Sequence, residues 1–107
     1  MIKEISPQEF IERRTAGTEM ILLDVREGWE TELAPVPSRI VHIPMGEIAN
    51  RLGELDPHAE TVVICRSGGR SLQVARFLAA HGFSSVANLA GGILAWSRDV
   101  DPTIPQY

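Results

Sequence analysis

Short apolar runs recur along the chain, separated by stretches in which apolar residues have helical spacing. The run "MILLDV" at residues 20–25 is apolar except for an acid near its end, which is typical of a strand buried on both faces of a sheet. "TVVIC" at residues 61–65 has the same character. Weaker runs predict three more strands, over residues 2–5, 40–44 and 86–89, the first of them at an edge of the sheet.

Helical patterns lie between most of these strands. Ser6, Pro7 and Glu9 match a capping box with a proline in the first turn, so a helix is predicted from Pro7 to about Ala16. The spacing of apolar residues predicts three more helices, over residues 45–55, 70–81 and 93–98.

Residues 27–39 interrupt this alternation. Pro35 and Pro37 disfavour long regular structure, so the segment is predicted to be a loop. Elsewhere strands and helices alternate, which implies parallel crossover connections. We therefore expect an α/β fold in which a small parallel β-sheet is flanked by helices on both faces.

Composition narrows the class of protein further. The 107 residues, with 44% hydrophobic and 22% charged, suit one globular domain over residues 1–107. A net charge of −4 argues against partners such as nucleic acid or an anionic membrane surface. No apolar run approaches the ~20 residues that span a bilayer, and the first ten residues do not resemble a signal peptide. We expect a cytoplasmic protein.

The only cysteine, Cys65, stands in "VVICRSGGRS" and cannot form an internal disulfide. It ends a predicted strand, and ligands of open α/β sheets collect at such ends. A glycine-rich turn and a helix N-terminus favour an anion and lower the pKa of a thiol, as do Arg66 and Arg70. Gly68 and Gly69 let the backbone wrap closely.

A cysteine at a strand end is also typical of a small buried hydrophobe. Two arginines and two glycines within five residues of Cys65 favour a reactive thiol over that interpretation. Nucleotide binding is disfavoured, because the loop lacks the lysine and spacing of a Walker A motif and its "GG" is a weak Rossmann signal.

Three segments together resemble the single-domain rhodaneses, a family of sulfurtransferases. They are "LLDVREGWE", "VVICRSGGRS" and "VANLAGGILAW", which occur in the family's order and spacing, and the resemblance as a whole extends over nearly the whole chain. The usual Gly-His-Ile segment of the family has no clear counterpart in "ELAPVPSRIVHIPMGEI". His42 is interpreted as a packed or edge residue of a strand rather than a metal ligand, and Trp96 as part of the core.

The resemblance implies a mechanism. The Cys65 thiolate would take the outer sulfur of a donor such as thiosulfate and pass it to cyanide, a small thiol or a protein thiol. Arg66 and Arg70 would hold the anionic end of the donor. The residues expected to bind substrate are Arg66, Ser67, Gly68, Gly69, Arg70 and Ser71. We expect no cofactor beyond the covalent sulfur and no metal, since one cysteine and three scattered histidines form no ligand cluster.

Supporting roles are expected outside this loop. Asp24 and Arg26 form either an internal ion pair at the floor of the pocket or an exposed surface pair. Glu27 and Glu30 are predicted to be charges at the rim, and Trp29 to mark a surface for a partner. The closing segment also resembles rhodanese domains joined to activating enzymes of ubiquitin-like proteins, which implies a place in sulfur relay.

Two other functions stay open. Cysteine-based phosphatases have a related loop with five residues between Cys and Arg. Only four separate Cys65 from Arg70, which makes the ring too tight for phosphate. The other alternative is a non-catalytic rhodanese-like module that binds a partner. Inactive members usually lack the cysteine that this chain keeps.

Overall fold

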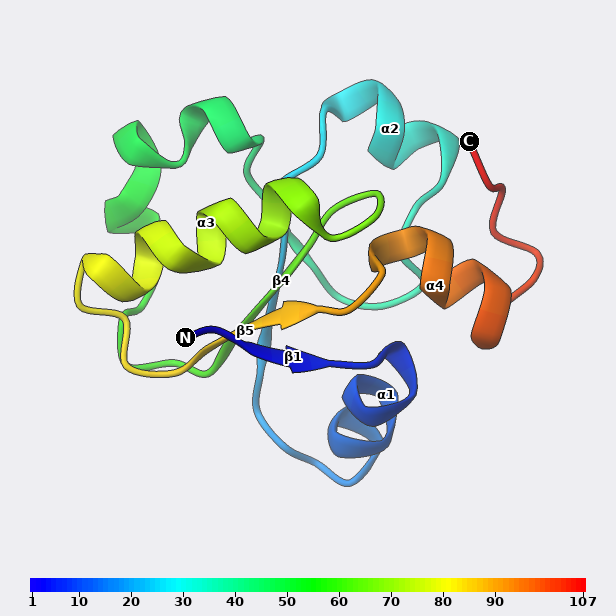
Figure 1. The fold of residues 1–107 in the computed structure, drawn as a ribbon, viewed down its shortest axis with the longest axis horizontal. Helices are drawn as coiled ribbons and strands as arrows, with labels where there is room; N and C mark the ends of the chain where they lie inside the picture. The colour runs from blue at the N-terminus through cyan, green and yellow to red at the C-terminus, as the bar shows by residue number, and fades with distance from the viewer.

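Five parallel strands form the centre of the molecule. The computed structural model describes residues 1–107, with strands β1 (Lys3–Ile5), β2 (Ile21–Asp24), β3 (Val41–His42), β4 (Thr61–Ile64) and β5 (Val86–Leu89). They pair in the order β1-β5-β4-β2-β3, and every pairing is parallel (Figure 1). The predicted α/β fold and the edge position of the first strand are confirmed.

Helices cover both faces of this sheet. They are α1 (Pro7–Thr15), α2 (Gly28–Leu33), α3 (Gly69–Ala80) and α4 (Gly92–Asp99), with two 3-10 segments, η1 (Met45–Glu47) and η2 (Ala49–Glu54). α1 and α4 pack together on one side, whereas α3 lies with η1 and η2 on the other (Figure 1). None of the helices is both long and apolar enough to cross a membrane.

The strands send alternate side chains into two apolar layers. In β4, Val62 and Ile64 pack into the layer that contains Trp96 of α4. Val63 points to the opposite layer, as does Cys65 directly after the strand, and both pack there with side chains of α3. Each fully buried aliphatic side chain of this kind stabilises the fold by about 1.5–3 kcal/mol. Because both faces are covered, the sequence of β4 is apolar almost throughout.

α1 begins where the sequence predicts. The hydroxyl of Ser6 accepts a hydrogen bond from the N–H of Glu9 at 3.1 Å, and Pro7 is the first helical residue. The helix ends at Thr15, and Gly17 follows with φ +92°, in the left-handed region typical of a helix C-terminus. The capping pattern in the sequence therefore predicted a real helix start.

The loop predicted over residues 27–39 is wrong in its first half, which forms α2. The carboxylate of Glu30 accepts a hydrogen bond from the N–H of Glu27 at 3.0 Å, as in a capping box. Pro35 and Pro37 follow the end of α2, so they do not prevent it. A helix of six residues shows too little periodicity to be recognised in a sequence.

The helix predicted over residues 45–55 is also wrong, because two short 3-10 segments take its place. Arg51 interrupts the second segment with φ −118°, outside the helical range. Gly46 and Gly53 lower the helical propensity of this stretch. The preceding strand is shorter than predicted, since only Val41–His42 pair with β2.

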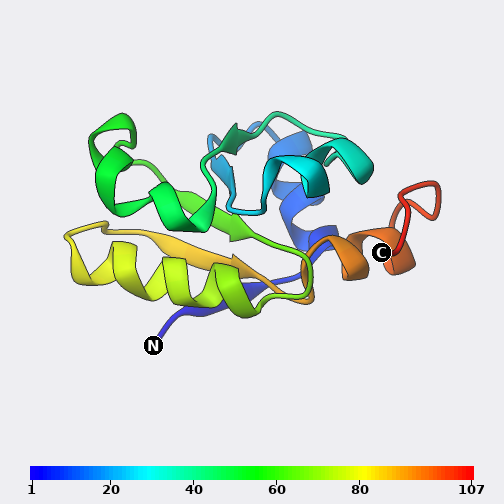
Figure 2. The same ribbon diagram turned by 90° about the horizontal axis from the view of Figure 1, so that it is seen from above.

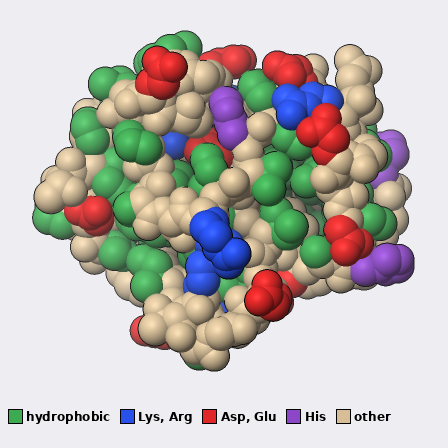
Figure 3. Space-filling model, turned by 180° about the vertical axis from the view of Figure 1, so that it is seen from behind, with side chains coloured by type: hydrophobic (Ala, Val, Ile, Leu, Met, Phe, Trp, Pro, Cys, Tyr) green, Lys and Arg blue, Asp and Glu red, His purple; other side chains and the backbone are tan.

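The surface carries mixed charges. On the face seen in Figure 3, acidic and basic side chains are scattered among apolar ones, and no continuous basic area is visible. The sequence contains 14 acidic and 10 basic residues. Residues of both charges are therefore present on that face.

Candidate active site

The candidate site is the turn that joins β4 to α3. Cys65 follows β4 directly, and three residues separate it from Gly69, the first residue of α3. The backbone N–H of Gly68 and the hydroxyl of Ser71 lie 3.1 and 3.2 Å from Sγ of Cys65. Gly68 has φ +106°, a conformation that favours glycine. The turn thus places hydrogen-bond donors around a thiol at the carboxyl end of a strand.

The surroundings of Cys65 act on its thiol in opposite directions. Only 1% of Cys65 is exposed, and this burial alone would raise the pKa of the thiol. Hydrogen bonds from the hydroxyl of Ser71 and from the backbone N–H groups of Ser71, Gly68 and Ser67 favour the thiolate and lower the pKa below its ordinary value. The donors outweigh the burial, so the loop favours an anionic sulfur.

The turn before α4 holds the same loop from outside. The N–H groups of Ile93 and Leu94 donate to the carbonyl oxygens of Cys65 and Arg66 at 2.9 and 3.1 Å. Gly92 has φ +60°, and a Cβ added there would lie 2.5 Å from both oxygens. Glycine is therefore required where α4 starts beside the loop (Figure 2). Because these two carbonyl oxygens accept hydrogen bonds from α4, they point away from Sγ of Cys65. The N–H groups of the loop can then point toward the sulfur.

Arg70 is bound to Glu30 of α2. Two nitrogens of its guanidinium lie 2.6 and 2.8 Å from the two carboxylate oxygens, which makes a bidentate ion pair. The predicted place of Glu30 at the rim is wrong, because only 3% of it is exposed. The bond from Arg70 lowers the pKa of Glu30 to about 2, against the effect of burial and with the help of Tyr107.

Tyr107 joins this network from the last position of the sequence, and Figure 1 shows that end of the chain beside α2. Its hydroxyl donates to Glu30 at 2.7 Å and accepts a hydrogen bond from Arg26 at 3.1 Å. Its carbonyl oxygen accepts a hydrogen bond from Nε of Arg66, whose guanidinium lies 5.3 Å from the centre of its ring. Both arginines of the loop therefore have partners within the protein, and their contact with a donor stays a prediction.

Asp24 and Arg26 form an ion pair behind this network. Both side chains are fully buried, and a terminal nitrogen of Arg26 lies 2.9 Å from Oδ2 of Asp24. Of the two arrangements that the sequence left open, the exposed surface pair is wrong. Arg26 also donates to the carbonyl oxygen of Ala34 at 2.9 Å and to the hydroxyl of Tyr107. The pair holds the end of α2 and so helps to position Glu30.

Asn88 of β5 is a polar residue at the site that the sequence pattern did not single out. It is only 2% exposed, and its Oδ1 lies 2.5 Å from the hydroxyl oxygen of Ser71. Its Nδ2 donates to the carbonyl oxygen of Gly68 at 3.1 Å and to the carboxylate of Glu4. The sequence did offer a sign of its role, because Asn88 is an amide within the apolar strand "VANL" and a buried polar side chain must find hydrogen-bond partners.

His42 and Trp29 lie outside the Cys65 loop, on β3 and α2. His42 is a packed strand residue, as predicted, with Nε2 lying 2.6 Å from the carbonyl oxygen of Arg26. Trp29 lies on α2 and is 63% exposed, with its ring centre 5.9 Å from that of Tyr107. Its role in binding a partner stays a prediction.

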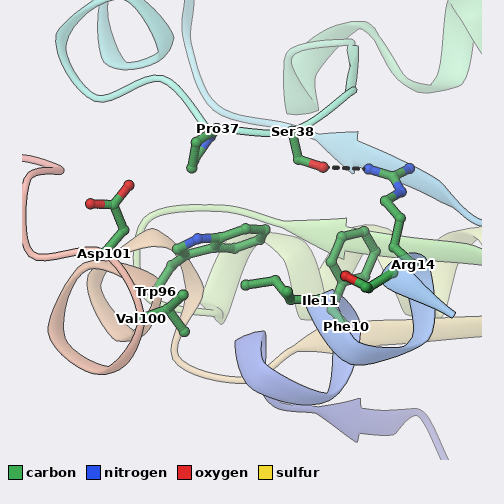
Figure 4. A pocket seen from close by; sticks show the side chains of 9 residues that line it. Phe10, Ile11, Arg14, Pro37, Ser38, Trp96, Val100 and Asp101 are labelled. Carbon is green, nitrogen blue, oxygen red and sulfur yellow. Dashed lines mark hydrogen bonds between the residues drawn. The ribbon is translucent and has the colours of Figure 1, made fainter.

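A cavity of about 480 Å³ lies apart from this site, beside α1 and α4 (Figure 4). Phe10 and Trp96 contribute apolar walls, and Arg14 contributes the basic group. The guanidinium of Arg14 donates to the hydroxyl of Ser38 at 2.7 Å and to two backbone carbonyl oxygens. No residue of the 65–71 loop lines this cavity, so it is not the pocket of the candidate site.

The structure is thus an α/β protein whose parallel sheet ends in a loop of amide and hydroxyl donors around one buried thiol. The chain belongs to the family of the Rhodanese-like domain, whose sequence model matches residues 6–99. Both the family and the α/β fold that the sequence predicted are confirmed.

Several of the similar proteins are named sulfurtransferases. The chain is 43% identical over 101 residues to "Putative sulfurtransferase YtwF" of Bacillus subtilis, covering 94% of this chain and 96% of that protein. It is 33% identical over 104 residues to "Sulfurtransferase" of Allochromatium vinosum, covering 97% and 96%. It is 31% identical to "Adenylyltransferase and sulfurtransferase MOCS3" of Arabidopsis thaliana, covering 96% of this chain but only 25% of that protein.

Solved structures share the fold. A rhodanese-like domain protein from Staphylococcus aureus has a TM-score of 0.84 at 26% identity and matches 99% of both chains. A thiosulfate sulfurtransferase from Pseudomonas aeruginosa has a TM-score of 0.80 at 26% identity, over 91% of this chain and 19% of that one. The chain is therefore a member of the rhodanese-like sulfurtransferases.

Proposed function

We propose that the protein transfers a sulfane sulfur from thiosulfate or a similar anionic donor to a thiophilic acceptor, through a persulfide on Cys65. The observation that carries this proposal is the cradle of donors at Sγ, with Gly68 N–H at 3.1 Å and the Ser71 hydroxyl at 3.2 Å. A thiolate is the nucleophilic form of cysteine, and these donors favour it.

In the first half-reaction, the Cys65 thiolate attacks the outer sulfur of thiosulfate. The bond between the two donor sulfurs breaks, sulfite leaves with the electron pair, and a persulfide anion stays on Cys65. The donors that favour the thiolate also stabilise this anion, in the manner of an oxyanion hole. In the second half-reaction, the acceptor attacks the outer sulfur and the thiolate leaves, which restores Cys65.

Arg66 is the arginine better placed to attract the donor. Arg70 is paired with the carboxylate of Glu30 in a bidentate contact, which compensates most of its charge. Arg66 is exposed, forms no ion pair with an acidic side chain, and donates a hydrogen bond to a backbone oxygen of Tyr107. A dianionic donor that approaches the loop therefore meets an exposed guanidinium at Arg66 that no acidic side chain holds.

The sulfur has to leave this chain for its acceptor. Cys65 is the only cysteine, so no second thiol can relay the sulfur internally. Cyanide, a small thiol or a protein thiol are the acceptors proposed. The similarity to part of "Adenylyltransferase and sulfurtransferase MOCS3" supports a protein acceptor in a sulfur relay.

Turnover with thiosulfate and cyanide, followed as thiocyanate, tests this function. We expect turnover by the unchanged protein and none by Cys65→Ser, which keeps the shape of the side chain and loses the thiolate. Hydrolysis of an aryl phosphate would instead support a phosphatase. If neither substrate is turned over while the protein still binds a partner, the chain is a binding module and the proposal fails.

A further inference from the structure

The hydroxyl of Ser71 lies between two groups that compete for its single proton. Its oxygen is 2.5 Å from Oδ1 of Asn88 and 3.2 Å from Sγ of Cys65. A serine hydroxyl donates one hydrogen bond and can accept others, so it cannot donate to both groups at once. The hydroxyl therefore donates either to Asn88 or to the sulfur, and it leaves the other without this donor.

The other contacts of Asn88 fix which atom of its amide faces Ser71. Nδ2 lies 3.1 Å from the carbonyl oxygen of Gly68 and 3.1 and 3.2 Å from the carboxylate oxygens of Glu4. All three oxygens are acceptors, so a flipped amide would place Oδ1 against them without a donor. Oδ1 consequently faces Ser71, where it can only accept a hydrogen bond.

We propose that Asn88 is a positioning residue that sets the direction of the Ser71 hydroxyl and thereby restrains the ionisation of Cys65. While the sulfur is a neutral thiol, Ser71 donates to Asn88 and accepts the S–H. When the sulfur is a thiolate or a persulfide anion, the hydroxyl turns to the sulfur and Oδ1 of Asn88 loses its donor. Asn88 thus disfavours the thiolate of Cys65, whereas the N–H groups of the loop favour it. This inference rests on the proposed role of Cys65.

The charged groups around the loop also influence the pKa of Cys65, so the test has to distinguish their effect from that of Asn88. The charged groups that face it are Glu4 of β1, Asp24 of β2, Arg26 after that strand, Glu30 of α2, and Arg66 and Arg70 of the loop; the titratable phenol of Tyr107 lies beside them. Most of them are paired with one another. Glu4 contacts Asn88 directly and has no cationic partner, so its charge is the one to control.

The experiment measures the pKa of the Cys65 thiol from the pH dependence of its alkylation, which reports one site because the chain has no other cysteine. Asn88→Leu keeps the branched shape and removes the acceptor, so Ser71 is free to donate to the sulfur. We expect the pKa to fall by up to about one unit, which is up to tenfold more thiolate at neutral pH.

Ser71→Ala should raise the pKa of Cys65, because the thiolate then loses a donor. In the Ser71→Ala background, Asn88→Leu should have no further effect, since Asn88 acts through Ser71. A merely structural role of Asn88 predicts the opposite sign, because a loosened Gly68 N–H disfavours the thiolate. A raised pKa in Asn88→Leu, or the same shift with and without Ser71, would overturn the proposal.

Glu4→Gln is the matched control, since it removes the charge and keeps an oxygen for Nδ2. It should leave the pKa of Cys65 unchanged, and a shift equal to that of Asn88→Leu would assign the effect to charge and overturn the proposal. Circular dichroism checks the fold of each variant, and Asn88→Ala, with the same expected sign, replaces a leucine variant that does not fold. The alkylation assay needs no sulfur donor, so failure of the proposed transfer reaction would be seen separately.

Discussion

The substitution Gly92→Ala tests whether the turn before α4 supports the Cys65 loop. Its φ of +60° lies in the left-handed region, where a residue with a side chain is disfavoured by about 1–2 kcal/mol. In Gly92→Ala, the new Cβ would meet the carbonyl oxygens of Cys65 and Arg66 at 2.5 Å. These are backbone atoms that cannot rotate away, so α4 and the loop must separate.

Separation breaks the hydrogen bonds from Ile93 and Leu94 to those two carbonyls, each worth about 1 kcal/mol. Together with the backbone strain, we expect the free energy of unfolding to fall by about 3–4 kcal/mol. That is a large part of the roughly 5–15 kcal/mol by which domains are stable. The pKa of Cys65 should also rise, because the loop amides lose their fixed direction.

Urea denaturation followed by circular dichroism measures this loss. Gly17→Ala is the matched control, because Gly17 has φ +92° and an added Cβ there meets no atom within 4 Å. Gly17→Ala likewise has an unfavourable backbone conformation but no steric clash, so its free energy of unfolding should fall by only about 1–2 kcal/mol. If the free energy of unfolding falls equally in the two variants, the contact between this turn and the loop is not the reason why residue 92 is glycine.

Three further changes test the network around the loop. Removing Arg26 with Arg26→Met leaves the carboxylate of Asp24 buried and unpaired, so urea denaturation should show a loss of about 3–5 kcal/mol; a loss below 1 kcal/mol would contradict the buried pair. The pKa of Glu30 falls from 4.5 to about 2 on folding, so its contribution to stability is present above pH 4.5 and is lost as pH falls toward 2. Glu30→Gln should therefore flatten the stability profile between pH 5 and 2, and an unchanged slope would contradict this. Arg66→Gln should raise KM for thiosulfate several-fold with little change in kcat, whereas an unchanged KM would show that Arg66 does not meet the donor.

The hydrogen-bond donors around Cys65 were predictable because they lie close to it in the sequence. The thiol, the Gly68 amide and the Ser71 hydroxyl all lie within the short segment "CRSGGRS". Glu30 and Asn88 reach the loop from 40 and 17 residues away. Only the order of the strands and the docking of α2 bring them there, and neither is visible in the spacing of residue types.

The sheet was predictable for a related reason. β2 and β4 are covered on both faces, so each appears in the sequence as a continuous apolar run. α2 and the 3-10 segments are too short to repeat a helical period, and tertiary contacts determine their form. The contact of α2 with Arg26 and Arg70 accounts for the burial of Glu30, which the sequence placed at the rim.

The intact mass of the protein after incubation with thiosulfate tests the central claim most directly. Excess donor is removed before weighing, and Cys65→Ser is treated in parallel. The account predicts that the unchanged protein gains the mass of one sulfur atom, that cyanide discharges it, and that the variant gains nothing. No gain on a free, reduced Cys65, or an equal gain on Cys65→Ser, would contradict a persulfide at this residue with thiosulfate as its donor.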